Sequence, residues 1–346
     1  MKIKGFIAKT LAVIAAAMLA LTATACGGDE RSRAREFAVY MPDGAPAVAL
    51  AKLMNEGYSN TSFTVVPATS IAAQVSSGTA DLAIMPVNAA ATLYNKGVDI
   101  KLLTVNTHGN LYVVGTPDAD KPELAFSDLV GKRLGVIGMG NVPDLTMRMI
   151  LAELDIEAET SGEPQAGKIA VTYADDGGTL LPLLGQGKVD YALLAEPAAT
   201  TACNKFGKSV VMDVQAEWAR VMSGADYPQA CLVAKTEVVE NRSDYVNELI
   251  GALEAADGWA EANPDKALEA VKTNMAIGSE STLTALNAEI VRRCNIRTER
   301  AGAALNACEA YFAKLTQLQV GLGKPALDKV PDIGFYYLPA PEENDA

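Results

Sequence analysis

The chain has 346 residues, of which 49% are hydrophobic, 21% charged and 6% aromatic. At roughly 100–200 residues per domain, this length predicts about two domains with substantial cores, which excludes a small disulfide-stapled protein. The composition is that of a globular chain, and no apolar stretch reaches the roughly 18 residues of a spanning helix, so a disordered chain and a polytopic membrane protein are also excluded. The net charge is −13, with 42 acidic against 29 basic residues. Such a charge repels phosphate backbones, so we expect no nucleic-acid partner.

The N-terminal segment has the layout of a secretory signal. Lysines at positions 2, 4 and 9 precede an apolar run over residues 11–21, which is too short to span a membrane. Residues 21–26, Leu-Thr-Ala-Thr-Ala-Cys, resemble the lipobox of bacterial lipoproteins, where cleavage before the cysteine leaves it diacylated. We therefore expect a signal peptide at 1–25, a lipid anchor on Cys26 and a flexible tether at 26–35. A plain signal peptide cut near residues 23–25, leaving Cys26 as a spare thiol, is the alternative.

Export bears on the charge and on the cysteines of the mature protein. Cleavage after residue 25 would remove three of the 29 basic residues and none of the 42 acidic ones, leaving a net charge of −16. Besides Cys26, four cysteines would remain in an oxidising compartment, and of the three possible connectivities we expect the local pairs Cys203–Cys231 and Cys294–Cys308. Because no Cys-x-x-Cys spacing occurs and His108 is the only histidine, we expect no metal site.

From residue 37 the chain alternates short apolar runs with helical stretches, a pattern typical of βα units that build a largely parallel sheet. Strands are expected at 37–41, 63–66, 81–85, 101–105, 111–114, 133–137, 168–173, 191–194, 209–212 and 230–234. Helices are expected between them at 46–56, 71–77, 89–96, 143–154 and 198–206. Beyond residue 235 the pattern predicts helices only, at 242–261, 264–273, 283–291 and 301–320.

Two parts of the βα region resemble each other. Residues 39–46 and 136–143 both read as a strand, a small-residue loop and a proline in the first helical turn, where its missing N–H costs nothing. Residues 78–83 and 187–192 share the pattern Gly-x-x-Asp-x-Ala. The repeat favours two similar lobes, although any two βα units share some of these features.

Several motifs point to a known family. They are Asp-Gly-Ala-Pro at 43–46, the Gly-x-x-Asp-x-Ala element at 78–83, Leu-Val-Gly-Lys-Arg-Leu-Gly-Val at 129–136, the stretch from 187 to Glu-Pro at 196–197, and Tyr-Pro-Gln-Ala at 227–230. Together they resemble the solute-binding proteins of ABC importers, in the branch that binds nitrate, sulfonates, taurine and thiamine precursors. The resemblance implies an α/β, two-lobed type II periplasmic-binding fold with hinge strands and the ligand in the cleft between the lobes.

Carried onto this chain, the resemblance implies lobe 1 at residues 36–116 plus 231–346, with the C-terminal helices as an extension, and lobe 2 at 117–230. The crossings would fall near 111–116 and 229–234. It further implies a monomeric binding protein, not an enzyme, that needs no cofactor, is tethered on the extracytoplasmic face of the cell membrane and delivers a small molecule to an ABC permease. An enzyme of the same fold is the rival, since futalosine-pathway and pyrimidine-synthesis relatives share these lobes, although cytosolic enzymes would not need a signal peptide. A surface receptor that is not coupled to transport is a third possibility.

The loops at strand ends carry the information on the ligand, because open α/β sheets bind ligands there. We place these loops at 42–46, 67–70, 85–88, 106–110, 138–144, 174–178, 195–197 and 223–228. They contain no lysine or arginine, and their six carboxylates are Asp43, Asp144, Asp175, Asp176, Glu196 and Asp226. Since burying an unpaired anion is costly, this content predicts a neutral or cationic ligand, most simply a heterocycle or an amine, in preference to nitrate or a sulfonate.

Twelve residues are candidates for ligand binding. Asp43 and Glu196 are expected to pair with N–H or N⁺ groups, and the others are Gly44, Thr69, Ser70, Asn88, His108, Gly138, Met139, Gly140, Asn141 and Tyr227. The Gly-Met-Gly-Asn loop at 138–141 resembles half of a dinucleotide fingerprint, but Pro143 replaces the third glycine, so no dinucleotide cofactor is expected.

Structural roles remain open for the same residues. The glycines could form a turn, Thr69 and Ser70 could cap a helix, His108 could be a polar turn residue and Tyr227 a core residue. Arg148, within two turns of a helix start, is the main exception to this charge argument, because its long side chain could still reach the cleft.

Overall fold

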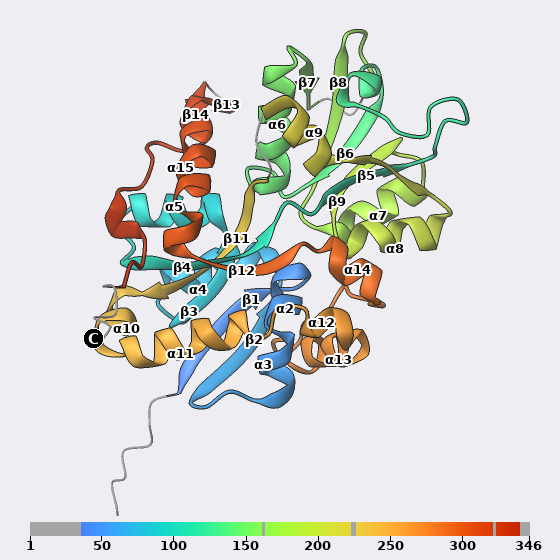
Figure 1. Cartoon of the computed structure of the whole chain (residues 1–346). Coiled ribbons are helices and arrows are strands. Elements are labelled where there is room, and N and C mark those ends of the chain that lie inside the picture. The colour runs from blue at the N-terminus through green and yellow to red at the C-terminus, as the bar shows by residue number, and fades with distance from the viewer. Residues whose placement is uncertain (1–35, 161–162, 223–225, 321–322, 340–346) are drawn as a thin grey trace, which may run out of the picture. The chain divides into compact units, whose positions relative to one another are not determined.

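The structure, a computed structural model, describes residues 36–160, 163–222, 226–320 and 323–339. Its framework is two six-stranded mixed sheets, each flanked by helices (Figure 1). The expected signal peptide and the whole of the expected tether, which includes Cys26, lie outside the described residues. Within these ranges, none of the helices has the length and apolar character needed to cross a membrane.

The first sheet has the strand order β12-β4-β11-β3-β1-β2. Its strands are β1 (Phe37–Pro42), β2 (Thr61–Val66), β3 (Leu82–Pro86), β4 (Ile100–His108), β11 (Pro228–Lys235) and β12 (Ile296–Arg300). β2, β1 and β3 run parallel, whereas β11, β4 and β12 join by antiparallel pairing. The central strands are buried on both faces, which explains their nearly continuous apolar runs.

The second sheet has the order β10-β5-β9-β6-β8-β7. Its strands are β5 (Leu111–Gly115), β6 (Arg133–Ile137), β7 (Glu157–Glu159), β8 (Lys168–Ala174), β9 (Tyr191–Ala195) and β10 (Ser209–Asp213). β9, β6, β8 and β7 are parallel, and β5 and β10 are antiparallel. The expected largely parallel sheet is therefore mixed in both lobes, because β5 and β11 each enter their sheet from a crossing and run against their neighbours.

Helices surround each sheet. In the first lobe they are α2 (Ala45–Ala49), α3 (Ala51–Glu56), η1 (Ala68–Ser70), α4 (Ile71–Ser76), α5 (Val87–Asn95), α10 (Thr236–Asn241), α11 (Ser243–Glu254), α12 (Trp259–Ala262), α13 (Pro264–Thr273), α14 (Ala288–Arg293), α15 (Ala301–Gln317) and η3 (Ile333–Phe335). In the second lobe they are η2 (Phe126–Leu129), α6 (Val142–Glu153), α7 (Gly177–Gly185), α8 (Ala198–Phe206) and α9 (Val214–Met222). A two-stranded hairpin of β13 (Gln319–Val320) and β14 (Lys324–Pro325) follows α15.

All ten expected strands are present, and the main differences lie in the helical part. The helix expected at 242–261 is divided into α11 and α12 by residues 255–258, where Gly258 has a left-handed φ of 79°, and the one expected at 46–56 divides at Leu50. β12 is a strand in the region where only helices are expected. Its sequence, Ile-Arg-Thr-Glu-Arg, has no apolar alternation, and it is held at the sheet edge by backbone pairing with β4.

The lobe boundary also differs from the expectation. β5 belongs to the second sheet, so the first crossing falls at residues 109–110, before the expected 111–116. The second crossing leads into β11, which belongs to the first sheet.

The internal repeat is confirmed in the topology. β1 and β6 hold equivalent places in the two sheets, as do β3 and β9. The aspartate of each Gly-x-x-Asp element has the same role: Asp81 Oδ2 accepts a bond from the Ala38 backbone N–H at 3.1 Å, and Asp190 Oδ2 accepts one from the Arg133 N–H at 2.9 Å. Each carboxylate thereby fixes the start of the neighbouring strand.

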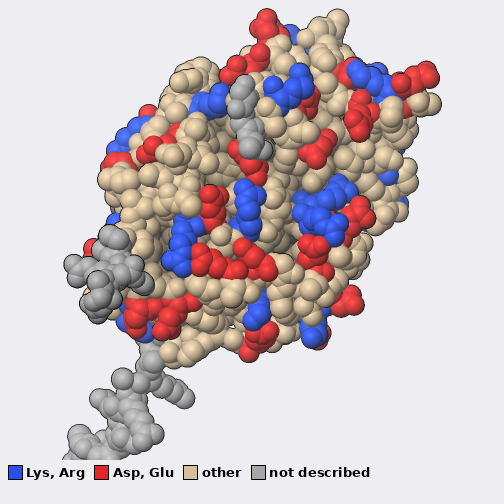
Figure 2. Space-filling model, viewed as in Figure 1, with Lys and Arg blue, Asp and Glu red and all other residues tan. Residues whose placement is uncertain are grey.

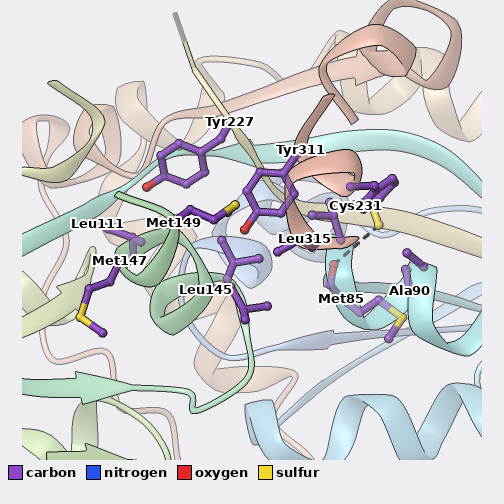
Figure 3. Packing of buried hydrophobic residues seen from close by; sticks show 14 of the residues in the cluster. Met85, Ala90, Leu111, Leu145, Met147, Met149, Tyr227, Cys231, Tyr311 and Leu315 are labelled. Carbon is purple, nitrogen blue, oxygen red and sulfur yellow. Dashed lines mark hydrogen bonds between the residues drawn. The ribbon is translucent and has the colours of Figure 1, made fainter. Parts of the chain in front are cut away.

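One apolar core connects the two lobes. Leu145 and Met149 on α6 lie against Tyr311 and Leu315 on α15 (Figure 3). Tyr227 is 1% exposed within this cluster, with its ring centroid 6.4 Å from that of Tyr311. This core therefore holds α15 of the first lobe against α6 of the second lobe.

The expected disulfides are not formed, since Cys203, Cys231, Cys294 and Cys308 are all free. The reason is their placement. Cys203 packs in a cluster of the second lobe, whereas Cys231 lies in the first sheet and its thiol donates to the Met85 carbonyl at 3.7 Å. Cys308 belongs to the core cluster of Cys231, and Cys294 ends α14 elsewhere. Proximity in sequence was therefore a poor guide to proximity in space.

Candidate functional site

A cavity of about 290 Å³ lies between the lobes, where the strands of both sheets end. The first lobe lines it with residues 42–46, 67–69 and Pro86, and with Met275, Glu280, Thr282 and Leu283. The second lobe contributes Ile137, Gly138, 141–143, 175–178, Leu181, 195–198 and Thr201. Thr107, Asn110, Gln229 and Ala230, which we call the floor, come from β4, β11 and the crossing after β4. Seven of the eight loops expected at the cleft thus contribute described residues to it, and the described part of the eighth, residues 226–228, does not.

Six of the twelve candidate residues line the cavity and six do not. Those that line the cavity are Asp43, Gly44, Thr69, Gly138, Asn141 and Glu196. Those that do not are Ser70, Asn88, His108, Met139, Gly140 and Tyr227. The segment from Met275 to Leu283 was missed, because it follows a helix far along the chain and reaches the cleft through a bridge between Val65 and Met275.

Among the candidates outside the cavity lining, Ser70, Asn88 and Tyr227 make hydrogen bonds within the protein. Ser70 donates to the Pro67 carbonyl at 2.8 Å, and the Tyr227 hydroxyl donates to Gln215 Oε1 at 2.9 Å. Asn88 Nδ2 donates to the Gly140 carbonyl at 3.0 Å and so joins the two lobes. Met139 is 66% exposed. These residues have structural or surface roles in this conformation.

Asp43 is engaged by the protein itself. Ser281 Oγ donates to Asp43 Oδ1 at 2.8 Å, and the backbone N–H and hydroxyl of Thr282 donate to Oδ2 at 2.6 and 2.7 Å. The carboxylate therefore holds the segment around Thr282 at the cavity wall and is stabilised by three hydrogen-bond donors.

Glu196 is engaged more completely. Its side chain is fully buried and lies 2.8 Å from the guanidinium of Arg293, which belongs to the first lobe. The hydroxyl and backbone N–H of Thr200 also donate to it, at 2.8 and 3.0 Å. Burial raises the pKa of Glu196 above its usual value, while the Thr200 bonds and the Arg293 charge act in the opposite direction. This ion pair is a buried tie between the lobes.

The helix starts of the second lobe already hold carboxylates. Asp144, in the first turn of α6, accepts a bond from the Gly140 N–H at 2.9 Å. Asp176 caps α7 by accepting from the Thr179 N–H at 2.8 Å, and Glu196 does the same for α8 through Thr200. A helix N-terminus attracts anions through its free N–H groups and its dipole. At α7 and α8 the protein's own acids occupy that role, whereas Asp144 binds the loop N–H of Gly140 and the start of α6 has no side-chain cap among the described residues.

Arg148 does not reach the cavity. Its guanidinium contacts Asp144 Oδ1 at 2.7 Å and the Tyr173 hydroxyl at 2.6 Å, and Tyr173 donates to the same carboxylate at 2.7 Å. Burial, followed by the Asp144 charge, raises the pKa of Tyr173, which remains protonated. Arg148, which the sequence offered as a possible cation of the cleft, is therefore paired within the second lobe.

Other cations near the crossing are also paired. Arg292, Arg293, Arg297 and Arg300 lie within nine residues of α14 and β12, and they contact Glu261, Glu196, Asp226 and Glu254, respectively. Figure 2 shows basic and acidic side chains intermingled across this face. Among the residues that the structure describes, no lysine or arginine lines the cavity.

His108 lies at the crossing, outside the cavity. Its ring is 5% exposed, with Nδ1 4.0 Å from Asp226 Oδ2 and Nε2 3.9 Å from Glu299 Oε2. Burial, helped by the Arg297 charge, lowers the pKa of His108 to about 4, although Asp226 opposes this. The ring is therefore neutral at neutral pH.

The floor is made of uncharged polar groups. Gln229 Nε2 donates to Asn110 Oδ1 at 2.5 Å, and Gln229 Oε1 accepts from the Asn110 N–H at 3.3 Å. Thr107 is 1% exposed, and its hydroxyl is the one buried side-chain polar atom of the described cavity lining that has no hydrogen-bond partner. By contrast, Asp175 and Glu280 on the walls are exposed. The cavity is thus neutral at its floor and acidic at its walls.

Comparison with known proteins places this arrangement in a family. The NMT1/THI5-like family matches residues 64–267, which is more than half of the chain. No curated protein matches the sequence. An ABC transporter structure from Parabacteroides distasonis is 24% identical, with a TM-score of 0.67, and the alignment covers 87% of this chain and 98% of that one.

Two further structures show the same fold. The periplasmic aliphatic sulphonate binding protein SsuA from Escherichia coli is 14% identical, with a TM-score of 0.59 and coverage of 90% and 94%. The Candida albicans CA3427 gene product, described as having the generic periplasmic binding protein fold, is 12% identical, with a TM-score of 0.54 and coverage of 84% and 92%. The chain has the periplasmic-binding-protein fold and belongs to the NMT1/THI5-like family.

Proposed function

We propose that this protein is an extracytoplasmic solute-binding lipoprotein that captures a small neutral or cationic organic ligand, of heterocyclic type, and delivers it to an ABC importer. The observation that carries the proposal is a cavity between two lobes whose described lining contains carboxylates but no lysine or arginine. The general role agrees with the fold and with the ABC transporter from Parabacteroides distasonis among similar structures. Binding without chemistry is the role that the site supports best, because Asp43, Asp176 and Glu196 are engaged in structural bonds.

The charge of the site favours the ligand class. An anion buried in this cavity would need arginine, lysine or free helix N–H groups. The described lining supplies none of the cations, and carboxylates cap α7 and α8, whereas no described side chain caps α6. SsuA is an aliphatic sulphonate binding protein, but at 14% identity that ligand does not transfer to this chain. A cation or a neutral nitrogen compound instead meets Asp175 and Glu280 on the walls.

Two lobes joined by crossing strands can close over a ligand as rigid units. The ligand shifts the equilibrium only by its greater affinity for the closed state. Asn88 with Gly140 and Glu196 with Arg293 are inter-lobe contacts that hold the present arrangement. The binding energy of the ligand therefore adds to that of these two inter-lobe contacts in favouring the closed state.

Thermal unfolding in the presence of candidate ligands tests the proposal. A compound at about 100 times its Kd should stabilise the folded state by roughly 2.7 kcal/mol if only that state binds it. Recovery of the compound unchanged after incubation is the expected companion result. Stabilisation accompanied by a product detected by mass spectrometry would support the rival enzyme and contradict the binding role.

Membrane attachment through Cys26 is part of the proposal. Replacing Cys26 with Ser should move the full-length protein from the detergent phase to the aqueous phase in a partition assay, since the two acyl chains that anchor it would be lost. Cys203→Ser is the matched control and should leave partitioning unchanged. Retention of the Cys26→Ser variant in the membrane fraction would contradict lipidation at this residue.

A further inference from the structure

The floor of the cavity contains one hydrogen-bonding group that the protein does not use. Thr107 lies in β4 between β11 and β12, where it is opposite Ala230 on one side and Ile296 on the other. Its side chain is 1% exposed, it lines the cavity, and its hydroxyl has no hydrogen-bond partner among the described residues. A buried hydroxyl without a partner destabilises the folded state, so its presence requires an explanation.

The neighbouring polar side chains that the structure describes form no hydrogen bond with the Thr107 hydroxyl. The Asn110 and Gln229 side chains are bonded to each other, and Asn110 Nδ2 also donates to the Cys294 carbonyl at 3.3 Å. Thr104, on the same strand and fully buried, donates its hydroxyl to Asn106 Oδ1 at 2.8 Å and does not line the cavity. β4 therefore carries two buried threonines, one satisfied within the protein and one that faces the cavity.

We propose that the Thr107 hydroxyl is the ligand anchor at the cavity floor and selects a ligand with a neutral hydrogen-bonding atom at its inner end. A hydroxyl both donates and accepts, so a ligand hydroxyl, carbonyl, amino group or ring nitrogen satisfies it. A charged inner end is disfavoured because Glu196, the buried carboxylate beside this region, is already paired with Arg293. A positive charge on the ligand belongs at the outer end, near the exposed acids Asp175 and Glu280. The inference rests on the proposed binding function and specifies how the ligand is oriented.

The test compares Thr107→Val with Thr104→Val. Both substitutions keep the shape of the side chain and remove one hydroxyl. In the ligand-free protein, Thr107→Val should raise the melting temperature, because an unpaired buried hydroxyl is lost, whereas Thr104→Val should lower it, because a bond is lost and Asn106 Oδ1 is left without that donor. If Thr107→Val lowers the melting temperature as much as Thr104→Val does, the hydroxyl is already satisfied in the free protein and the inference is overturned.

Binding provides the second readout. The probe is the hydroxymethyl-aminopyrimidine precursor of thiamine, a neutral heterocycle with several hydrogen-bonding atoms, titrated by calorimetry. Thr107→Val should weaken its binding about tenfold, the value of one hydrogen bond, and Thr104→Val should change it less than twofold. Equal affinity for wild type and Thr107→Val would overturn the inference while leaving the proposed function intact. If wild type does not bind the probe, the proposed ligand class is weakened, and the melting temperatures decide the role of Thr107.

Discussion

At the scale of single residues, His108 offers a direct check on the electrostatics of the crossing. Its pKa is lowered to about 4 by burial and by Arg297, against the attraction of Asp226. As the only histidine, it gives one set of imidazole signals in a proton NMR titration of protein without an affinity tag. We expect these signals to titrate near pH 4. A midpoint at 6 or above would show that the ring is solvated or paired with Asp226 or Glu299.

The same shift predicts a pH dependence of stability. A folded pKa below the unfolded value near 6.5 means that the neutral ring is favoured in the folded state. This contribution is present above pH 6.5 and is lost as the pH falls through about 4. It amounts to roughly 3 kcal/mol. Urea unfolding at pH 7 and pH 4 should therefore show a smaller acid-induced loss in His108→Gln than in wild type, and equal losses would contradict the assignment.

The Glu196–Arg293 pair predicts a loss of stability that is larger at neutral pH than in acid. Arg293→Met leaves a fully buried carboxylate without its cation and should cost about 3 kcal/mol in the free energy of unfolding at pH 7. The control, Arg292→Met, breaks an exposed pair with Glu261 and should cost less than about 1 kcal/mol.

Acidification should reduce the cost of Arg293→Met. Because the pKa of Glu196 is raised, the folded state favours the protonated form, and the stability from this form is present below about pH 4.5 and lost as the pH rises through the folded pKa. Loss of Arg293 raises that pKa further. A cost that is the same at pH 5 and pH 8 would show that the carboxylate is not the group left unpaired.

At the scale of elements, the turn between β4 and β5 depends on a glycine. A Cβ on Gly109 would lie 2.7 Å from Tyr227 Cε1 and 2.7 Å from Gln215 Cγ, and the Tyr227 ring is fixed in the core. Gly109→Ala should therefore destabilise the protein by about 1–3 kcal/mol. Gly251 in α11 has no neighbour within 4 Å of such a Cβ, so Gly251→Ala should instead stabilise by about 0.5–1 kcal/mol. Equal melting temperatures of the two variants would contradict the packing described at the crossing.

Elements with a short apolar run or a clear amphipathic pattern were predicted correctly, because their local pattern and their tertiary environment agree. β6 and α13 have the expected limits. β12 was missed, since backbone pairing with β4 stabilises it without an apolar pattern. The helix expected at 283–291 begins only at Ala288, where Asn287 is its N-cap. The residues before it line the cavity wall, where the Thr282 N–H is bonded to Asp43. Local sequence does not encode such tertiary demands.

At the scale of the whole molecule, the sequence predicted the two lobes and most of the cleft loops but not the state of the cleft residues. Asp43 and Glu196 are at the cavity as expected, yet Thr282 and Arg293 already satisfy them. Those partners lie far away in the chain, so no motif around residue 43 or 196 could reveal them. His108 and not the adjacent Thr107 was predicted as a ligand-binding residue, because the sequence does not show which side chains of β4 point toward the cavity.

Calorimetry on the mature domain tests the central claim, that the cleft binds neutral or cationic organic ligands and excludes anions. The panel is a thiamine pyrimidine precursor, riboflavin, spermidine, taurine and nitrate. The matched control is Ala68→Trp, which places a large side chain in the cavity from an exposed position outside the core. We predict saturable binding of a nitrogenous compound by wild type, its loss in Ala68→Trp, and no heat with taurine or nitrate. Tight binding of taurine or nitrate, without response to the nitrogenous compounds, would contradict the account.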